Sequence, residues 1–338
     1  MSSLDTDRLL LALETSCDET AAAVVDESLR VRSSVVASQI DLHASFGGVV
    51  PELASRAHTE TITAVVARAL DEAGVAHGSE LAAVAVTSGP GLVGALLVGI
   101  ATAKSLALGW GVPLVAVNHL EGHLASVYLA DPDVPFPQTA LLVSGGHCML
   151  TRASGPGRYA LLGETVDDSI GEAYDKVARF LGLGYPGGPV LDRLAATGED
   201  VLGFPRPMLA EGYTFSFSGL KTAVVNHVRA DPGFSETDVA ASFVAACMDV
   251  LIAKVRRALQ EFGDPAVAIV GGVAASPILR ARAQVLADEF GARLLIPPHA
   301  MATDNAAMIG VAGWHKLAVS GASAPSFGPE PDLRLQFA

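Results

Sequence analysis

The two halves of the sequence repeat one order of secondary structure, and this repeat constrains the fold more than any single motif. Apolar runs with strand or helix spacing predict, in the first half, strands over 9–13, 21–25 and 33–38, a helix over 51–73, a strand over 81–87, a helix over 92–108, a strand over 113–117 and a helix that begins at His119. The second half predicts strands over 139–143, 148–152 and 159–163, a helix over 169–181, a largely helical stretch over 190–260, a strand over 266–270, a helix over 277–290, a strand over 293–296 and a helix over 304–319. Both halves therefore read βββαβαβα, which indicates an internal duplication.

Two such units predict an α/β protein with a duplicated actin-like (ASKHA) fold, in which two lobes flank a central cleft. This is the layout of actin, hexokinase and the heat-shock ATPases, which hold a nucleotide between their lobes. We expect an N-terminal lobe over 1–134 and a C-terminal lobe over 135–303, with the helix at 304–325 packing back on the first lobe. The Pro- and Gly-rich tail over 326–338 is expected to be loose. The polar turns that follow the first strand of each half, at 15–20 and 144–147, are expected to face the cleft.

Composition excludes several classes of protein. Half of the 338 residues are hydrophobic and 17% are charged, as in a globular chain. The most apolar region, 92–117, contains Lys104, several glycines and Pro113, so it lacks the uninterrupted ~20 apolar residues of a membrane span. Three scattered cysteines without a Cys-x-x-Cys pair, and no signal pattern at the start, fit a reducing cytoplasm. The net charge of −14 argues against this chain gripping nucleic acid unaided.

His119 and His123 lie four residues apart, which places both imidazoles on one face of a helix, as a metal ion requires. The alternative is that both are ordinary surface or cap residues. The zinc-protease motif His-Glu-x-x-His is absent, because Glu121 comes two residues after the first histidine and faces a different side of the helix. Asp304 either supplies a third ligand or serves as an N-cap or first-turn acid of the last long helix.

Glycine-rich turns follow two predicted strands. Ser144-Gly145-Gly146-His147 can bring backbone N–H groups close to a phosphate, although a plain hairpin turn favours the same glycines. The turn from Gly271 to Ser276 precedes a helix and could hold part of a nucleotide, or simply connect strand to helix.

Asp175 lies too far into its helix to be explained by the helix dipole, and Asp192 could bind a ribose hydroxyl or sit in solvent.

Taken together, the motifs of this chain resemble those of the TsaD family, the bacterial tRNA N6-adenosine threonylcarbamoyltransferases once described as glycoproteases. The motifs that carry the resemblance run in order from Leu9 to about His315: Glu14-Thr15-Ser16-Cys17-Asp18, Gly47-Gly48-Val49-Val50-Pro51-Glu52, Asn118-His119-Leu120-Glu121-Gly122-His123, Ser144-Gly145-Gly146-His147, Gly171-Glu172-Ala173, Tyr185-Pro186-Gly187-Gly188-Pro189, Phe215-Ser216-Phe217-Ser218-Gly219-Leu220-Lys221 and Asp304-Asn305-Ala306-Ala307-Met308.

The resemblance implies transfer of a threonylcarbamoyl group from threonylcarbamoyl-AMP to N6 of the adenosine 3′ of the anticodon, in tRNAs that read ANN codons. It implies one divalent metal ion, Fe²⁺ with Zn²⁺ as the alternative, held by His119, His123 and Asp304. The donor contacts that it implies fall on these residues: Leu142, Val143, Ser144, Gly145, Gly146, Asp175, Gly188 and Asp192, with Ser276 where the family usually has Asn. The implied partners are TsaB and TsaE, with TsaC making the donor, in the cytoplasm and without a membrane.

An adenine amine is a poor nucleophile, so a carboxylate is expected to accept its proton. Asp18, at the tip of the first hairpin, is the candidate in preference to Glu14 and Glu19. Two other functions remain open from the residues. One is a small-molecule kinase of the same fold, which would have no use for a His–His–Asp metal site. The other is a non-catalytic, ATP-dependent scaffold, which would not need the intact set of ligands.

Overall fold

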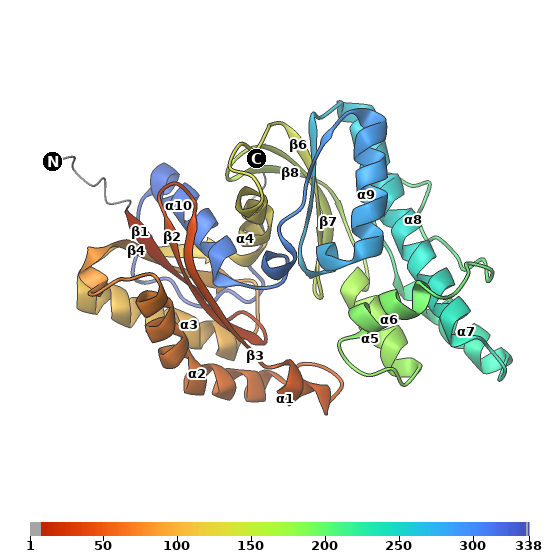
Figure 1. The fold of residues 1–338 in the computed structure, drawn as a ribbon, viewed down its shortest axis with the longest axis horizontal. Helices are drawn as coiled ribbons and strands as arrows, with labels where there is room; N and C mark the ends of the chain where they lie inside the picture. The colour runs from red at the N-terminus through yellow and green to blue at the C-terminus, as the bar shows by residue number, and fades with distance from the viewer. Residues whose placement is uncertain (1–7, 336, 338) are drawn as a thin grey trace. The chain divides into compact units, whose positions relative to one another are not determined.

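The computed structural model describes residues 8–335 and 337, and the chain divides into two compact units (Figure 1). The first comprises Met1–Asp133 and Asp304–Gln336, and the second comprises Val134–Thr303 and Phe337–Ala338, each as far as the chain is described. Each unit contains a five-stranded sheet, ordered β3-β2-β1-β4-β5 in the first and β8-β7-β6-β9-β10 in the second. The matching order confirms the predicted α/β fold with internal duplication.

In the first unit an antiparallel meander is extended by two parallel strands. The strands are β1 (Leu9–Glu14), β2 (Glu19–Asp26), β3 (Val31–Ser38), β4 (Leu81–Gly89) and β5 (Leu114–Asn118). β2 is antiparallel to both β1 and β3, whereas β4 is parallel to both β1 and β5. Parallel neighbours need a long crossover. Here α2 (Pro51–Glu72) and α3 (Val93–Trp110) supply the crossovers, while α1 (Ile40–Ala44) and α4 (His119–Ala125) are short.

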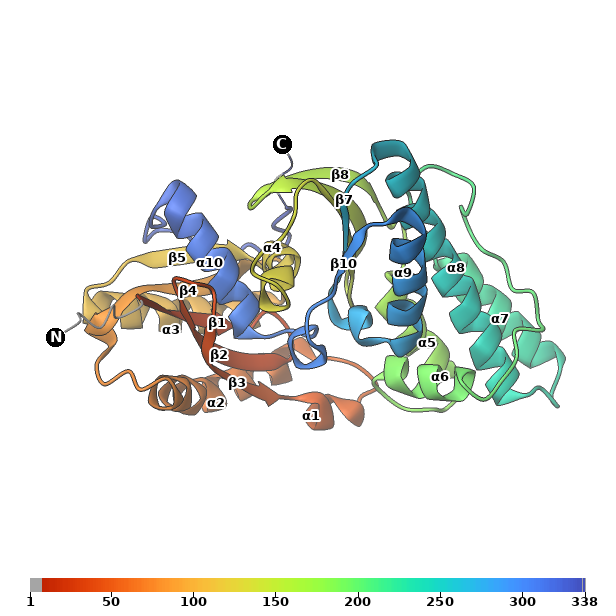
Figure 2. The same cartoon turned by 45° about the horizontal axis from the view of Figure 1, so that its top comes forward.

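The two faces of this sheet are covered by different helices, as Figure 2 shows. Successive side chains of a strand point to opposite faces. Leu11 and Leu13 of β1 join the core formed with α2 and α3. α10 (Ala306–Ser320) covers the other face, where a Cβ added at Gly310 would lie 2.5 Å from Val25, and one at Gly313 would lie 2.8 Å from Ala85. Glycine at these two positions therefore lets α10 approach the sheet closely.

The second unit repeats the meander and the parallel extension. Its strands are β6 (Gln138–Val143), β7 (Cys148–Gly155), β8 (Arg158–Glu164), β9 (Ala266–Val270) and β10 (Arg293–Leu295). Its helices are α5 (Ile170–Phe180), α6 (Gly187–Ala195), α7 (Ser218–Ala230), α8 (Glu236–Phe262) and α9 (Pro277–Phe290), with α8 and α9 side by side in both views (Figures 1 and 2). α8 begins at the Ser235 cap and ends at Gly263, whose φ of 63° suits a left-handed C-cap. Phe243 and Leu251 of α8 are fully buried in this unit's core.

One helix among the described residues, α3, is long and apolar enough to cross a membrane by length and composition, although core helices pass the same test. Leu96, Ile100 and Ala103 of α3 are buried in the core that this helix forms with the sheet and α2. A third of α3 is buried in this way, so packing accounts for only part of its apolar character.

The tail beyond residue 325, which the sequence predicts to be loose, makes hydrogen bonds to the first unit in the part that the structure describes. The backbone N–H of Glu330 donates to Ser88 O at 2.8 Å, and that of Gly91 donates to Pro331 O at 3.1 Å. Nδ2 of Asn118 donates to Arg334 O at 3.3 Å. Polar groups at or just after the ends of β4 and β5 need partners, and residues of the tail supply some of them.

Candidate functional site

The positions of His119 and His123 are set by Asn118, the N-cap residue of their helix. The side chain of Asn118, the last residue of β5, accepts hydrogen bonds from Leu120 N at 2.8 Å and Glu121 N at 3.3 Å. This N-cap starts α4 at His119, so His123 follows one turn later on the same face. His119 is 7% exposed and His123 is completely buried, so neither is an ordinary surface residue.

Asp304 lies just before α10, and it is not the N-cap of that helix. Asn305 caps α10 by accepting a hydrogen bond from Met308 N at 3.0 Å. The carboxylate of Asp304 instead faces the two imidazoles. A Cβ added at Gly122 would lie 2.6 Å from Cδ1 of Ile309, so this glycine lets α4 approach the first turn of α10 closely. That approach brings Asp304 to the histidine pair.

The three side chains form a compact set of potential ligands. One ligand atom from each lies within 4.8 Å of the other two. Oδ1 of Asp304 is 3.1 Å from Nε2 of His123 and 3.6 Å from Nε2 of His119. Both ring nitrogens of His123 are buried; among the described residues Nδ1 has no hydrogen-bond partner, and Nε2 faces only the carboxylate of Asp304. Buried polar atoms normally have partners, and two imidazoles with one carboxylate suit a divalent metal with open positions. The donor set therefore fits the implied metal.

Charges around this set favour the proton-bound form of His119 when only the protein is considered. Burial lowers the pKa of His119, but the carboxylates of Asp304 and Glu14 outweigh it and raise the pKa to about 9. Burial likewise raises the pKa of Glu14, yet His119 and the Thr87 hydroxyl leave it below its ordinary value. Cation binding would therefore replace a proton at this site.

The turn after β1 carries the proposed base. Asp18 is 8% exposed, and the neighbouring carboxyl of Glu19 interacts with it. Burial, the charges of Asp304 and Asp18, and a hydrogen bond with Asp18 raise the pKa of Glu19 to about 10. His58 of α2 fixes this turn, because its Nε2 lies 3.0 Å from Cys17 O and its Nδ1 lies 2.7 Å from the Thr20 hydroxyl. No motif of the sequence singles out His58 for this contact.

Glu121 does not belong to the ligand set. Burial raises the pKa of its carboxyl, and the charge of Lys316 on α10 partly offsets that effect. The set that the structure brings together contains His119, His123 and Asp304 without Glu121. The arrangement thus offers no support for a zinc-protease base at this position.

In the second unit, three turns meet at the end of β6. A Cβ added at Gly171, at the start of α5, would lie 2.7 Å from Gly145 Cα, and the Ser169 hydroxyl donates to Gly145 O. A Cβ at Gly271 would lie 2.4 Å from Val143 O, and the φ of Gly271 is 92°. Gly145 and Gly146 have open space on the side where a Cβ would stand. The Ser144–Gly146 loop is therefore packed against α5 and the turn at Gly271 on one side, and its other side is open.

The other predicted donor residues in this unit form two linked pairs. Oδ1 of Asp175 accepts a hydrogen bond from Gly187 N at 2.8 Å, which places the start of α6, including Gly188, beside α5. Asp192 of α6 interacts with the hydroxyls of Ser276 and Tyr174, and burial raises the pKa of its carboxyl more than these two groups lower it. Asp192 is thus not a solvent residue.

Leu142 and Val143 are a different case. Their side chains are completely buried. Within β6 both residues are paired with β7, and Leu142 is also paired with β9. Only their backbone groups could contact a ligand.

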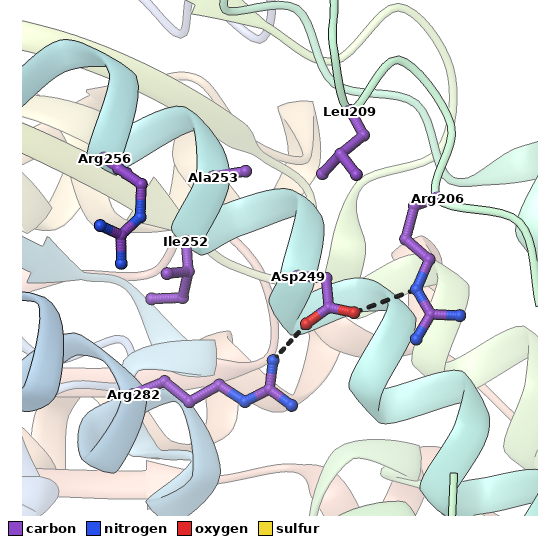
Figure 3. Close-up of a pocket in the computed structure, with 7 residues that line it drawn as sticks. All are labelled: Arg206, Leu209, Asp249, Ile252, Ala253, Arg256 and Arg282. Atoms are coloured by element: carbon purple, nitrogen blue, oxygen red, sulfur yellow. Dashed lines mark hydrogen bonds and ion pairs between the residues drawn. The ribbon is translucent and has the colours of Figure 1, made fainter. Parts of the chain in front are cut away.

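A separate hollow of about 300 Å³ lies on the second unit, beside α8 and α9 (Figure 3). Figure 3 shows Asp249 between two guanidinium groups, with Arg206 Nε at 3.0 Å and Arg282 Nη1 at 2.6 Å. Both arginines are thereby held by a carboxylate that cancels part of their charge. None of the predicted site residues lines this hollow.

Comparison with known proteins identifies the relatives of this chain. The family "TsaD: tRNA N6-adenosine threonylcarbamoyltransferase" matches residues 30–311. Curated proteins with the same name include one from Trichlorobacter lovleyi, 54% identical over 90% of both chains. One from Anaeromyxobacter dehalogenans is 51% identical over 96% of this chain and 99% of its own, and one from Halalkalibacterium halodurans is 49% identical over 97% and 96%.

Solved structures of low sequence identity share the fold. Full-length HypF, solved in a phosphate- and nucleotide-bound form, superposes with a TM-score of 0.63 at 14% identity, over 95% of this chain and 48% of HypF. Component A of the (R)-2-hydroxyglutaryl-CoA dehydratase of Acidaminococcus fermentans gives a TM-score of 0.56 at 13% identity, over 92% of this chain and 99% of its own. Both are actin-like, in agreement with the duplicated fold.

Proposed function

Because this chain belongs to the TsaD family of tRNA N6-adenosine threonylcarbamoyltransferases, we propose that threonylcarbamoyl-AMP is its donor and the adenosine 3′ of the anticodon is its acceptor, in tRNAs that read ANN codons. The chain is an enzyme of tRNA modification, and its reaction class is transfer of an acyl-type group. The observation that supports the proposal best is the full-length match to these transferases combined with the His119, His123 and Asp304 set. A small-molecule kinase and a non-catalytic scaffold are not favoured.

His119, His123 and Asp304 would hold one divalent metal ion, Fe²⁺ with Zn²⁺ as the alternative. Their nitrogen and carboxylate donors suit either ion, and buried His123 has ring nitrogens without another partner among the described residues. When bound, the ion would supply Lewis-acid stabilisation of negative charge on a carbonyl or phosphate oxygen.

Asp18 is the proposed general base. In the transfer, N6 of the adenine forms a bond to the carbamoyl carbon, the bond from that carbon to the phosphate oxygen breaks, and AMP leaves with the electron pair. The N6 proton passes to the carboxylate of Asp18. The structure weakens both rival bases. Glu14 is completely buried, and burial beside the charges of Asp304 and Asp18 raises the pKa of the Glu19 carboxyl, which disfavours its ionised form.

The second unit would bind the donor. The exposed face of the Ser144–Gly146 loop offers backbone N–H groups to a phosphate or a developing oxyanion. Asp192, which lies near the hydroxyls of Ser276 and Tyr174, would accept hydrogen bonds from ribose hydroxyls, and Asp175 and Gly188 would complete the site around the start of α6.

Partner proteins would supply what this acidic chain lacks, namely positive charge for tRNA. We propose TsaB and TsaE as partners, with TsaC making the donor, and a cytoplasmic location for the reaction. The exposed apolar stripe of α3 is a docking surface for such a partner. Val93 is 54% exposed, Leu97 is 53% exposed and Leu108 is 86% exposed, and their spacing places them along one side of the helix.

The proposal is tested by incorporation of radiolabelled threonine into unmodified tRNA, with bicarbonate, ATP, TsaC, TsaB, TsaE and this protein. Label should depend on this chain and fall strongly with His119→Ala. Asp18→Ala should also lose label while still binding metal and donor. If folded, metal-loaded protein with active partners incorporates no label, the transferase assignment is refuted. If Asp18→Ala retains transfer, the assignment of Asp18 as the general base is refuted.

A further inference from the structure

Glu14 is the last residue of β1, and its carboxylate is completely buried. Oε1 accepts a hydrogen bond from Ser16 N at 2.5 Å, and Oε2 accepts one from the Thr87 hydroxyl at 2.6 Å. Oε2 also lies 2.9 Å from Nδ1 of His119. A buried carboxylate is costly unless such partners satisfy it. Glu14 therefore has a fixed position and no exposed surface for contact with a substrate.

The sheet explains why these groups meet although 105 residues separate Glu14 from His119. β1 lies between β2 and β4, and the parallel register pairs Leu13 with Val86, so Glu14 stands beside Thr87 at the same end of the sheet. β5 pairs with β4 and leads directly into α4, which begins at His119. The contact follows from the fold, and no local motif carries it.

This contact determines which nitrogen of His119 is available. A neutral imidazole has one N–H and one lone pair, and an ionised carboxylate can only accept a hydrogen bond. Facing Glu14, Nδ1 must therefore carry the hydrogen. The lone pair is then on Nε2, the nitrogen that faces Asp304 at 3.6 Å. The Ser16 hydroxyl, 3.2 Å from Nδ1, can accept the same hydrogen.

We propose that Glu14 is a positioning residue of the metal site, which fixes the Nδ1–H tautomer and the ring orientation of His119 so that Nε2 can bind the ion. This inference rests on the metal site of the proposed function. It gives Glu14 a role different from that of a base, because its carboxylate acts through His119 and does not meet the reacting atoms.

The test compares the metal affinity of two variants of the full-length protein. In Glu14→Gln the amide has the size of the carboxylate, but its NH₂ group can donate to Nδ1 and so favour the Nε2–H tautomer, which has no lone pair on Nε2 to bind the ion. Thr87→Val removes a neighbouring hydrogen bond to the same carboxylate and leaves the Glu14–His119 contact in place. Co²⁺ and Zn²⁺ affinities would be measured by competition with a chromophoric chelator, and folding would be checked by thermal unfolding.

We expect Glu14→Gln to weaken metal binding by about 10- to 100-fold, as removal of such partners does elsewhere. We expect Thr87→Val to change it by less than about 3-fold, since the tautomer is kept. Equal losses in both variants would indicate a purely structural role, and wild-type affinity in folded Glu14→Gln would also overturn the proposal.

A second measurement does not depend on how the variants fold. Nitrogen-15 NMR of Zn²⁺-loaded wild-type protein with labelled histidine should show a proton on Nδ1 of His119 and the metal on Nε2. The reverse pattern would refute the inference even though the metal site stands. His123→Ala serves as the control for the site itself. A wild-type protein that binds metal no better than this variant would overturn the site and the inference together.

Discussion

The side chain of Ser276 has two roles, one at the start of α9 and one beside Asp192. Its hydroxyl accepts a hydrogen bond from Leu279 N at 3.3 Å and so caps α9, and it also interacts with the carboxyl of Asp192. The resemblance to the TsaD family implies asparagine at this place. Asparagine is as good an N-cap as serine, so the exchange preserves the helix start and changes the group that contacts Asp192.

We expect Ser276→Ala to lower the free energy of unfolding by about 1 kcal/mol, because the cap of α9 is lost. Donor affinity should fall as well, since Asp192 loses a partner that orients it. Ser276→Asn should keep the stability of the wild type. Urea unfolding and calorimetric titration with a non-hydrolysable donor analogue measure the two effects. Unchanged donor affinity in the alanine variant would show that Ser276 acts only as a helix cap.

At the scale of elements, the start of α7 is stabilised from outside its own sequence. Oδ1 of Asp167, which precedes α5, accepts hydrogen bonds from Phe217 N at 2.8 Å and Ser218 N at 3.3 Å. Its Oδ2 accepts from the hydroxyls of Ser216 at 2.6 Å and Ser218 at 2.7 Å. Asp167 thus satisfies the N–H groups at the start of α7, as an N-cap residue would, although it lies about 50 positions earlier in the chain.

The charge of Asp167 makes this cap dependent on pH. Burial raises the pKa of the carboxyl, but the bonds from Ser216, Ser218 and Phe217 outweigh it and leave the pKa below the ordinary value of 3.8. A lowered carboxyl pKa stabilises the fold above the ordinary value, and this contribution is lost as the pH falls through the folded-state value. We expect Asp167→Ala to cost about 1 kcal/mol at neutral pH. The difference from wild type should shrink below about pH 4. Urea unfolding across this range measures it, and a difference independent of pH would mean that the charge is unimportant.

The regular elements could be predicted closely because their signals are local. The apolar run that ends at Leu13 and the helix start at Pro51 lie within one or two residues of the observed bounds. Contacts between distant residues could not be predicted in this way. The pairing of Glu14 with His119 depends on strand order and register, and the position of His58 depends on where α2 crosses the first hairpin. Asp304 was open to two interpretations because the neighbouring Asn305 can also cap a helix, and only the fold shows which of them does so.

At the scale of the whole molecule, the distribution of charge bears on how tRNA is held. The chain carries a net charge of −14. The arginines in the hollow of Figure 3 do not reverse this locally, because Arg206 and Arg282 share Asp249 and Arg256 is paired with Glu289. Paired guanidinium groups are weak attractors of phosphate. This arrangement, like the total charge, supports the proposal that partner proteins supply a positive field.

Each unit has its own hydrophobic core, so ligands should stabilise the units separately. All three proposed metal ligands belong to the first unit, and the proposed donor residues from Leu142 to Ser276 belong to the second. A ligand that binds only the folded state at 100 times its dissociation constant adds about 2.7 kcal/mol of stability. Saturating metal should therefore slow amide hydrogen exchange in α4 and the start of α10, with little change in α8 and β9. A donor analogue should slow exchange in the β6–β7 turn and at the start of α9.

Hydrogen-exchange mass spectrometry on the full chain resolves these segments and tests the assignment of each ligand to its unit. His123→Ala is the matched control, because it should abolish the protection by metal and leave the protection by the donor analogue intact. Protection by metal that is as strong in α8 as in α4 would contradict the location of the metal in the first unit. If His123→Ala loses the protection by the donor analogue as well, binding of the donor analogue depends on the metal. The inference that the two ligands stabilise the two units separately would then be wrong.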